Sequence, residues 1–325
     1  MAARRWAIGA YLLQRAAGLI PVLFIITLVT FLSTALIRGD AASVLLGPTA
    51  TPERMAEVQK RFGLDQPLPI RYVKWIGQVL QGDLGNSILN KQPVTTLVGG
   101  ALRVTLQQIV MAMVIAAAIA AIVGITAATF RGTWLDSLLM GCALVGTSVP
   151  TFWLGLLLIY LFAVRWRILP PSGFVPFTED PVANLKSMIM PAFALGVYLA
   201  GPLARFIRSS LIEVYQTQFV TTARAKGLPE HAVMRGHALR NALIPTVTFA
   251  GLQIGGLLGG AIVTEVVFSL PGTGTLALSG ILNRDFPVVQ GVVLVVACGY
   301  VVINIAIDFL YVLLDPRITF GESRG

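Results

Sequence analysis

Long apolar stretches, separated by shorter polar segments, dominate the hydropathy pattern of this chain. A nearly uncharged run of about 20 residues predicts a membrane-spanning helix, because a helix of that length crosses the hydrocarbon core of a bilayer. The fourth such run is short and contains two prolines, and Pro150 lies inside the third. We expect an all-α membrane protein with a single membrane domain over residues 1–325. The six predicted spans are residues 16–37, 104–130, 137–164, 188–204, 242–268 and 286–314.

The first apolar run allows a second interpretation as a cleaved signal peptide. It follows basic residues that include Arg15, and residues 33–35 loosely resemble a cleavage site. Signal peptides have an apolar core of roughly 7–15 residues, and this run is longer. We therefore expect an uncleaved first helix.

Two polar segments are long enough to have structure of their own. Residues 38–103 are too charged to span a membrane and predict an extramembrane loop of modest size. Within it, Pro52 followed by apolar residues at helical spacing predicts a short amphipathic helix. Residues 205–241 form a second polar and basic segment, between the fourth and fifth spans.

The second polar segment contains a short helical pattern. Residues 216–226 predict about three helical turns, with Phe219, Val220 and Ala223 on one face. Gly227 then predicts the C-terminal end of the helix. A helix this short is marginal alone in water, so we expect it to dock against another surface. Periodicity alone equally allows an ordinary basic loop.

Composition places the chain in a membrane. Only 12% of the residues are charged and 56% are hydrophobic, and mean hydropathy is +0.80. Soluble domains carry about 25% charged residues, so this chain cannot cover a globular surface that faces water. The net charge of +9 could indicate nucleic-acid binding. In so hydrophobic a chain, basic residues more often lie in cytoplasmic loops, and no nucleic-acid partner is expected.

The distribution of Lys and Arg predicts the orientation. With the N-terminus inside, twelve basic residues fall in cytoplasmic segments and four in short external loops. Because basic residues are retained on the cytoplasmic side, we expect both termini in the cytoplasm of a bacterium. Residues 38–103 are then extracytoplasmic and residues 205–241 cytoplasmic, in a multi-pass protein of the plasma (inner) membrane.

The sequence contains no pattern that predicts catalysis, a cofactor or a metal. It lacks the GxxxxGK[ST] phosphate loop, so the chain is not expected to bind ATP. Cys142 and Cys298 lie in apolar runs and are interpreted as small packing residues, and His231 and His237 are too isolated for a metal site. Glu265 is expected near the outer interface, where a carboxylate stays charged more easily.

Several motifs, in a fixed order, resemble one family. TARAKGL at 222–228 and HALRNALIP at 237–245 look like the cytoplasmic EAA loop of ABC importer permeases. The agreement covers most of the chain. More narrowly, the chain resembles the first, B-type permease of the dipeptide/oligopeptide/nickel family. The other matching positions are 63–67, Tyr72, Trp75, GDLGNS at 82–87, 93–94, SVPTF at 148–152, Glu265, Phe268, PGTG at 271–274 and 314–317.

The resemblance implies a type I ABC importer permease fold, in which the short helix ending at Gly227 is the coupling helix. Such a helix rests on a cytoplasmic ATPase, whose ATP-driven closure moves it and the attached spans. The implied function is translocation of di- or oligopeptides. The residues implied for ATPase coupling are Phe219, Ala223, Arg224, Ala225, Lys226, Gly227, His237, Arg240, Asn241 and Pro245.

The resemblance also implies a set of partners. They are a second permease in a heterodimer, two cytoplasmic ABC ATPase subunits that bind ATP and Mg, and an extracytoplasmic peptide-binding protein; this chain itself would hold no cofactor. The outer loops are candidates for docking the binding protein, although they could equally only cap the bundle. The candidate docking residues are Asp83, Gly85, Ser87, Pro271, Gly272 and Gly274.

Three departures and two alternatives accompany this interpretation. The outer loop reads RGDA at 38–41, where PGDP is more usual. Gln218 stands where an acidic residue is usual and Thr221 where a basic one is usual, which weakens any assignment of particular salt bridges to the ATPase. A permease for nickel, haem or another small solute would share the same architecture. A secondary transporter would be expected to show inverted repeats or paired intramembrane charges, and the sequence has neither.

Overall fold

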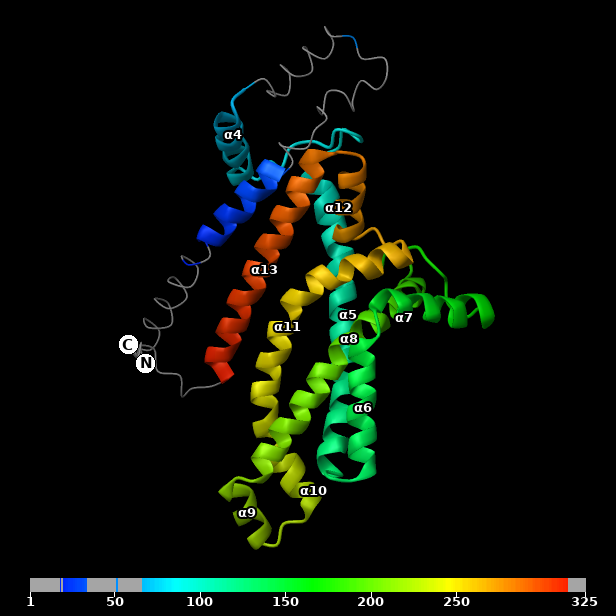
Figure 1. Ribbon diagram of the computed structural model, residues 1–325, viewed down its shortest axis with the longest axis vertical. Helices are drawn as coiled ribbons and strands as arrows, with labels where there is room; N and C mark the ends of the chain where they lie inside the picture. The colour runs from blue at the N-terminus through cyan, green and yellow to red at the C-terminus, as the bar shows by residue number, and fades with distance from the viewer. Residues whose placement is uncertain (1–17, 19, 34–50, 52–65, 315–325) are drawn as a thin grey trace. The chain divides into compact units, whose positions relative to one another are not determined.

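The computed structural model describes residues 18, 20–33, 51 and 66–314, and the described part is built from helices (Figure 1). The one β-bridge in this part pairs Asn86 with Pro93. A short apolar helix covers Ile20–Ser33. The other elements are α4 (Leu68–Leu80), α5 (Val94–Thr129), α6 (Trp134–Ser148), α7 (Thr151–Leu158), η2 (Ile159–Arg165), α8 (Pro181–Tyr215), α9 (Gln218–Ala225), α10 (Glu230–Val233), η3 (Met234–Ala238), α11 (Leu239–Phe268), α12 (Thr273–Leu282) and α13 (Phe286–Leu314).

Four described helices are long and apolar enough to cross a membrane, namely α5, α8, α11 and α13. The pair formed by α6 and residues 151–165 makes a fifth if it counts as one bent span. These helices coincide with predicted spans two to six. The predicted first span lies partly outside the described residues, and its described portion is the Ile20–Ser33 helix.

The third predicted span is bent rather than continuous. Its two halves meet at an angle of 97° at Pro150. Proline has no N–H to donate and disfavours the helical conformation of the residue before it. Val149 accordingly has an extended backbone, with ψ of 124°. The expectation of one span over 137–164 is therefore corrected to two helical pieces.

The fourth predicted span was too short, since α8 continues to Tyr215 in spite of Pro191 and Pro202 within it. Asp180 caps its first turn by accepting hydrogen bonds from two backbone amides. Seventeen of the 35 residues of α8 are buried, because the helix packs on α6, α7 and α11 (Figure 1). A Cβ at Gly196 would lie 2.9 Å from the carbonyl oxygen of Ala112, so α5 and α8 approach closely there.

The outer loop is also shorter than predicted. Helix α5 begins at Val94 rather than near residue 104, and α4 occupies part of the predicted loop. Aromatic contacts join α4 to the first helix: Phe31 stacks on Trp75 with 5.9 Å between ring centroids. Tyr72 shares a 2.9 Å hydrogen bond with Thr27. The short helix predicted after Pro52 lies outside the described residues.

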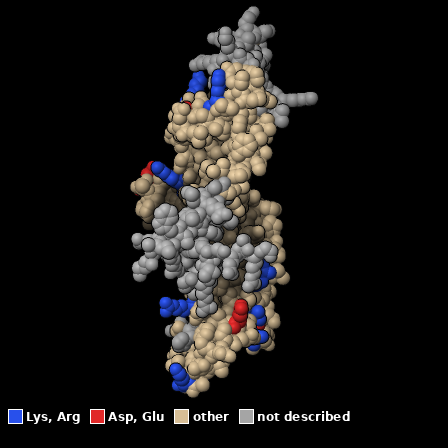
Figure 2. Space-filling view, turned by 90° about the vertical axis from the view of Figure 1, so that its left-hand side faces the viewer, with Lys and Arg blue, Asp and Glu red and all other residues tan. Residues whose placement is uncertain are grey.

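The described residues fall into two compact units. The first unit combines residues up to Val104 with residues 271–302, and its core is Val94, Val98, Val288 and Val292. The second unit holds residues 105–270 and the described residues from 303 onward. On the face in Figure 2, uncharged side chains dominate the described surface, as expected where lipid is the solvent.

Candidate functional site

Helix α9 lies in the segment between α8 and α11 and ends as the sequence predicts. Gly227 has φ of +78°. Its N–H donates to the carbonyl of Arg224 at 2.9 Å, and the N–H of Leu228 donates to the carbonyl of Ala223 at 3.3 Å. This pair of bonds is a Schellman motif, which favours glycine because the left-handed conformation strains other L-residues. The helix is shorter than predicted and begins at Gln218.

One face of α9 is buried against the chain that flanks it. Val220 and Ala223 pack with Val233 of α10 in a cluster completed by Val214 and Tyr215 at the end of α8. The docked helix is therefore held by both of its neighbours. The predicted face was partly wrong, because Phe219 is 43% exposed rather than buried beside Val220 and Ala223. Residues three apart share this face, and Phe219 points off it.

The opposite face of α9 combines apolar and basic side chains. Phe219 and Leu228 are exposed, as are Ala225 and Lys226. Arg224 is exposed as well, with its guanidinium 5.6 Å from the centroid of the Tyr215 ring. A surface of this kind is suited to contact with another protein.

The remaining coupling candidates lie further along the chain, beyond α10. The backbone of His237 belongs to η3, and its side chain lies outside the description. Arg240 and Asn241 are exposed at the start of α11, and Pro245 is exposed inside that helix. The structure thus brings residues 219–227 together and leaves the second part of the motif on a separate helix.

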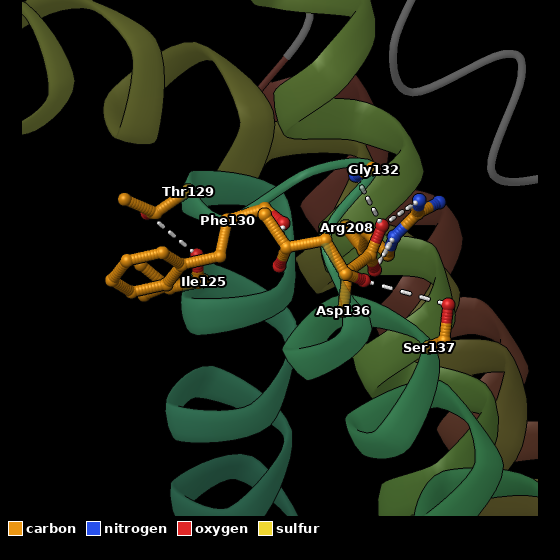
Figure 3. A network of polar contacts seen from close by, with 8 residues as sticks. Ile125, Thr129, Phe130, Gly132, Asp136, Ser137 and Arg208 are labelled. Carbon is orange, nitrogen blue, oxygen red and sulfur yellow. Dashed lines mark hydrogen bonds and ion pairs between the residues drawn. The ribbon is translucent and has the colours of Figure 1, made fainter.

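An ion pair between α6 and α8 was not predicted from the sequence. Arg208 donates from Nε to Oδ1 of Asp136 at 2.6 Å and from Nη2 to Oδ2 at 2.7 Å (Figure 3). The backbone N–H of Gly132 donates to Oδ2 at 3.0 Å. This two-pronged geometry is the stronger form of an Arg–carboxylate contact. It ties the turn between α5 and α6 to α8, about two helical turns before α8 ends at Tyr215.

The first group of docking candidates forms a tight turn in the first unit. Asp83 accepts a 2.8 Å bond from the backbone N–H of Gly85, which has φ of +79°. Ser87 is buried and donates to Asp285 at 2.5 Å. The same carboxylate accepts 3.1 Å from the N–H of Ile88. Asp285 was missed as an individual residue, because it is 198 positions away from Ser87.

The second group of docking candidates shapes the start of α12. Gly272 is the N-cap residue and, like Gly274, is buried, whereas Pro271 is exposed. Leu84 and Leu276 pack on the same valine cluster, so both groups of candidates belong to one folded region. Of the six candidates, Ser87, Gly272 and Gly274 support that region from within.

The structure bears on two further predictions about single residues. Glu265 is fully buried near the end of α11, where it accepts a 2.6 Å bond from Thr105. Its neighbour Thr264 is likewise buried and accepts from Gln108. This contact holds the carboxyl against α5, and the location of Glu265 near the outer interface stays a prediction. Cys142 and Cys298 are free and exposed, and so are not packed within the described chain.

Two family descriptions match this chain. One, "Binding-protein-dependent transport system inner membrane component", matches residues 120–320. The N-terminal component of the same kind of membrane protein matches residues 8–92. The chain therefore belongs to the binding-protein-dependent transport system inner membrane components: it is a multi-pass permease subunit of an ABC transporter, and ATP is hydrolysed by partner subunits.

Curated relatives cover nearly the full length of the chain. A putative peptide transport system permease protein of Brucella abortus (strain 2308) is 40% identical over 311 residues, which is 96% of this chain and 99% of the relative. A glutathione transport system permease protein of Salmonella paratyphi A is 40% identical over 310 residues, 95% of this chain and 99% of its own. A probable peptide ABC transporter permease of Sinorhizobium fredii is 36% identical over 96% of this chain and 100% of its own.

Among solved structures, the chain is similar to a crystal structure of an amino acid ABC transporter with histidines. The TM-score is 0.49 at 16% identity, over 69% of this chain and 95% of that one.

Proposed function

We propose that this chain is the permease through which an ATP-driven importer moves di- and oligopeptides delivered by an extracytoplasmic binding protein. The observation that supports the substrate class is the 40% identity, along 96% of the chain, to a relative described as a peptide transport permease. The relative described as a glutathione permease is equally identical, and glutathione is itself a tripeptide. Short peptides are the substrate class common to these relatives.

Helix α9 serves as the contact with the ATPase in this proposal. It is short, ends at a fixed glycine cap, and buries Val220 and Ala223 against its own chain. Its outward face presents the exposed side chains of Phe219 and Lys226 to a partner. Because α9 is packed on the end of α8, a displacement of α9 is passed to a helix that lies among α6, α7 and α11.

The proposal includes an orientation and an assembly. Both termini and α9 are cytoplasmic, and the turn around Ser87 faces the binding protein together with α12. A second permease completes a heterodimer with a type I importer fold, and two ATPase subunits bind ATP and Mg beneath it. The excess of basic residues in the segments on the α9 side supports this orientation.

The substrate class is tested by uptake in the bacterium that encodes this chain. A strain without the chain should lose uptake of labelled tripeptides, and a plasmid copy should restore it. Labelled glutathione and nickel, run in parallel, separate the members of the family. Loss of nickel or haem uptake with peptide uptake intact would contradict the peptide assignment.

A further inference from the structure

Helix α4 has two apolar faces, and the first of them packs on the Ile20–Ser33 helix. The rings of Tyr72 and Trp75 have their centroids 5.4 Å and 5.9 Å from that of Phe31. Tyr72 and Trp75 lie on the same side of α4, because residues three apart share a helix face. This side therefore attaches α4 to the first helix, within the first compact unit (Figure 1).

The second apolar face of α4 is open. Ile70, Val73, Gly77 and Leu80 follow one another at spacings of three and four residues, which places them on one side of the helix. The side chains of Ile70, Val73 and Leu80 are 48%, 69% and 82% exposed. A Cβ added at Gly77 would meet nothing within 4 Å. The described chain thus leaves an apolar strip uncovered along α4.

The polar residues of α4 form a narrow third side. Arg71, Lys74 and Gln78 also have helical spacing, and α4 contains no acidic residue. Lys74 donates to Gln66 at 2.8 Å, and the guanidinium of Arg71 lies 5.9 Å from the centroid of the Phe31 ring. Because both cationic groups already have partners in the chain, their charge identifies no ligand. The open apolar face decides what α4 contacts.

The level of α4 along the first helix indicates what covers that face. Tyr72 shares a hydrogen bond with Thr27, and its ring centroid lies 6.2 Å from that of Phe24. Helix α4 therefore runs beside the apolar helix and not beyond its end. At the same level of that helix, Ile25 and Val29 are exposed as well. In a membrane protein, exposed apolar side chains at this level are solvated by lipid, whose tails are as apolar as they are.

We propose that α4 is an amphipathic anchor at the membrane interface, with Ile70, Val73 and Leu80 in the acyl region of a phospholipid layer. The side that carries Lys74 and Gln78 faces the headgroups and water. Helices with one apolar and one polar face bind lipid surfaces in this way, by burying the apolar face at the boundary between headgroups and acyl chains. Zwitterionic lipid is sufficient, because the apolar face makes the contact.

Other occupants fit the position of this face less well. A water-soluble partner would have to reach a surface beside Thr27, in the middle of the apolar run at 16–37. A second permease reaches that depth, and measurements on the assembled transporter separate it from lipid. Residues 68–80 thus move from the extramembrane loop to the membrane boundary, where α4 would hold the first helix at a set depth. Whichever solute is transported, the lipid contact is the same.

The test uses single spin labels on the full-length chain in phosphatidylcholine nanodiscs, in the background Cys142→Ala/Cys298→Ala. Val73→Cys and Leu80→Cys report on the open apolar face. The matched controls, Lys74→Cys and Gln78→Cys, report on the polar side. All four positions are exposed on one helix, so the labels differ in direction and not in burial.

The measured quantity is the ratio of label collisions with oxygen, which concentrates among acyl chains, to collisions with a water-soluble nickel chelate. This ratio should be about fivefold or more higher at Val73 than at Lys74, and at Leu80 than at Gln78, because only the apolar face enters the lipid. The two pairs are independent, so a variant that fails to fold leaves the other pair to decide.

Three results would overturn the proposal. Equal ratios on the two sides would place the apolar face in water. Labels at Val73 and Leu80 that are shielded from both reagents in the chain alone would show that protein covers this face. Shielding that arises only when the second permease or the binding protein is added would assign the face to that partner.

Discussion

Gly227 has a positive φ and two backbone hydrogen bonds that end α9, so its replacement has a defined effect. Gly227→Val places a β-branched side chain in a left-handed conformation that such residues rarely adopt. We expect the cap to be lost and ATP hydrolysis to become uncoupled from uptake, with membrane insertion unchanged. In proteoliposomes containing the complete transporter, ATPase activity should continue while peptide uptake falls about tenfold or more. A reduction of this size corresponds to losing the coupling free energy between the ATPase and the permease.

The matched control for Gly227 is a residue that tolerates the same backbone. Gly227→Asn should retain most of the uptake, since asparagine adopts the left-handed region more readily than other non-glycine residues. Gly236→Val provides a second comparison, because a side chain at Gly236 meets nothing within 4 Å. Normal uptake by Gly227→Val would remove α9 from the coupling role.

The ion pair between Asp136 and Arg208 is predicted to stabilise the fold. Asp136→Asn leaves the guanidinium without its charged partner and should lower the free energy of unfolding by about 1–3 kcal/mol, the loss typical of a charged hydrogen bond. Thermal unfolding in detergent measures this loss. Asp136→Asn and Arg208→Gln together should cost less than the sum of the two single changes, because the two residues share one interaction. Additive losses would show that the pair contributes nothing of its own.

At the scale of helices, each long apolar helix that the structure describes coincides with a run that hydropathy predicts, but hydropathy did not predict where the helices end. Charged residues at 205 and 208 suggested a loop, yet α8 continues past them because Ile207 and Leu211 remain buried on one face. The reverse happened at Pro150, where an unbroken apolar run conceals a 97° bend. Burial against neighbouring helices thus extends α8 beyond the point where its composition predicts an end. At Pro150, the missing backbone N–H interrupts a helix that composition predicts to continue.

Helix α8 depends on close approach to α5, which gives a prediction at Gly196. Gly196→Val would force a side chain against the Ala112 carbonyl and Ile115, and should destabilise the chain by about 1–3 kcal/mol through overpacking. Gly141→Val, on α6, is the control, because nothing lies within 4 Å of a Cβ there. Thermal unfolding of both variants in detergent compares them. Equal stability of the two would mean that α5 and α8 can separate without loss.

At the scale of the whole chain, the candidate site was predictable only where it is local. The helix before Gly227 and its cap depend on about a dozen consecutive residues, so both could be predicted from the sequence. The ion pair between Asp136 and Arg208 and the bond from Ser87 to Asp285 join residues 72 and 198 positions apart. Periodicity does not reveal such partners. It also could not show that the buried face of α9 is the one on which Val233 packs from the next helix.

The proposed orientation makes a prediction for the whole chain. In a variant whose Cys142 and Cys298 are replaced by Ala, a cysteine at Thr222 should react with a membrane-impermeant maleimide only after the cytoplasmic side is opened. A cysteine at Asn90 should react in intact spheroplasts. Both positions are exposed, so burial does not confuse the comparison. Labelling of Thr222→Cys in intact spheroplasts would invert the orientation and remove α9 from the reach of any cytoplasmic ATPase.

The hydrogen bond between Ser87 and Asp285 connects the turn after Ser87 to the start of α13, two segments that are far apart in the sequence. Asp285 directly precedes α13, and its carboxylate holds the turn that follows Ser87 by three separate donors. If α13 tilted at its N-terminal end, the loop after Ser87 would therefore move with it. In the proposed orientation, a binding protein docked on this turn would respond to the tilt of α13 before any solute has crossed.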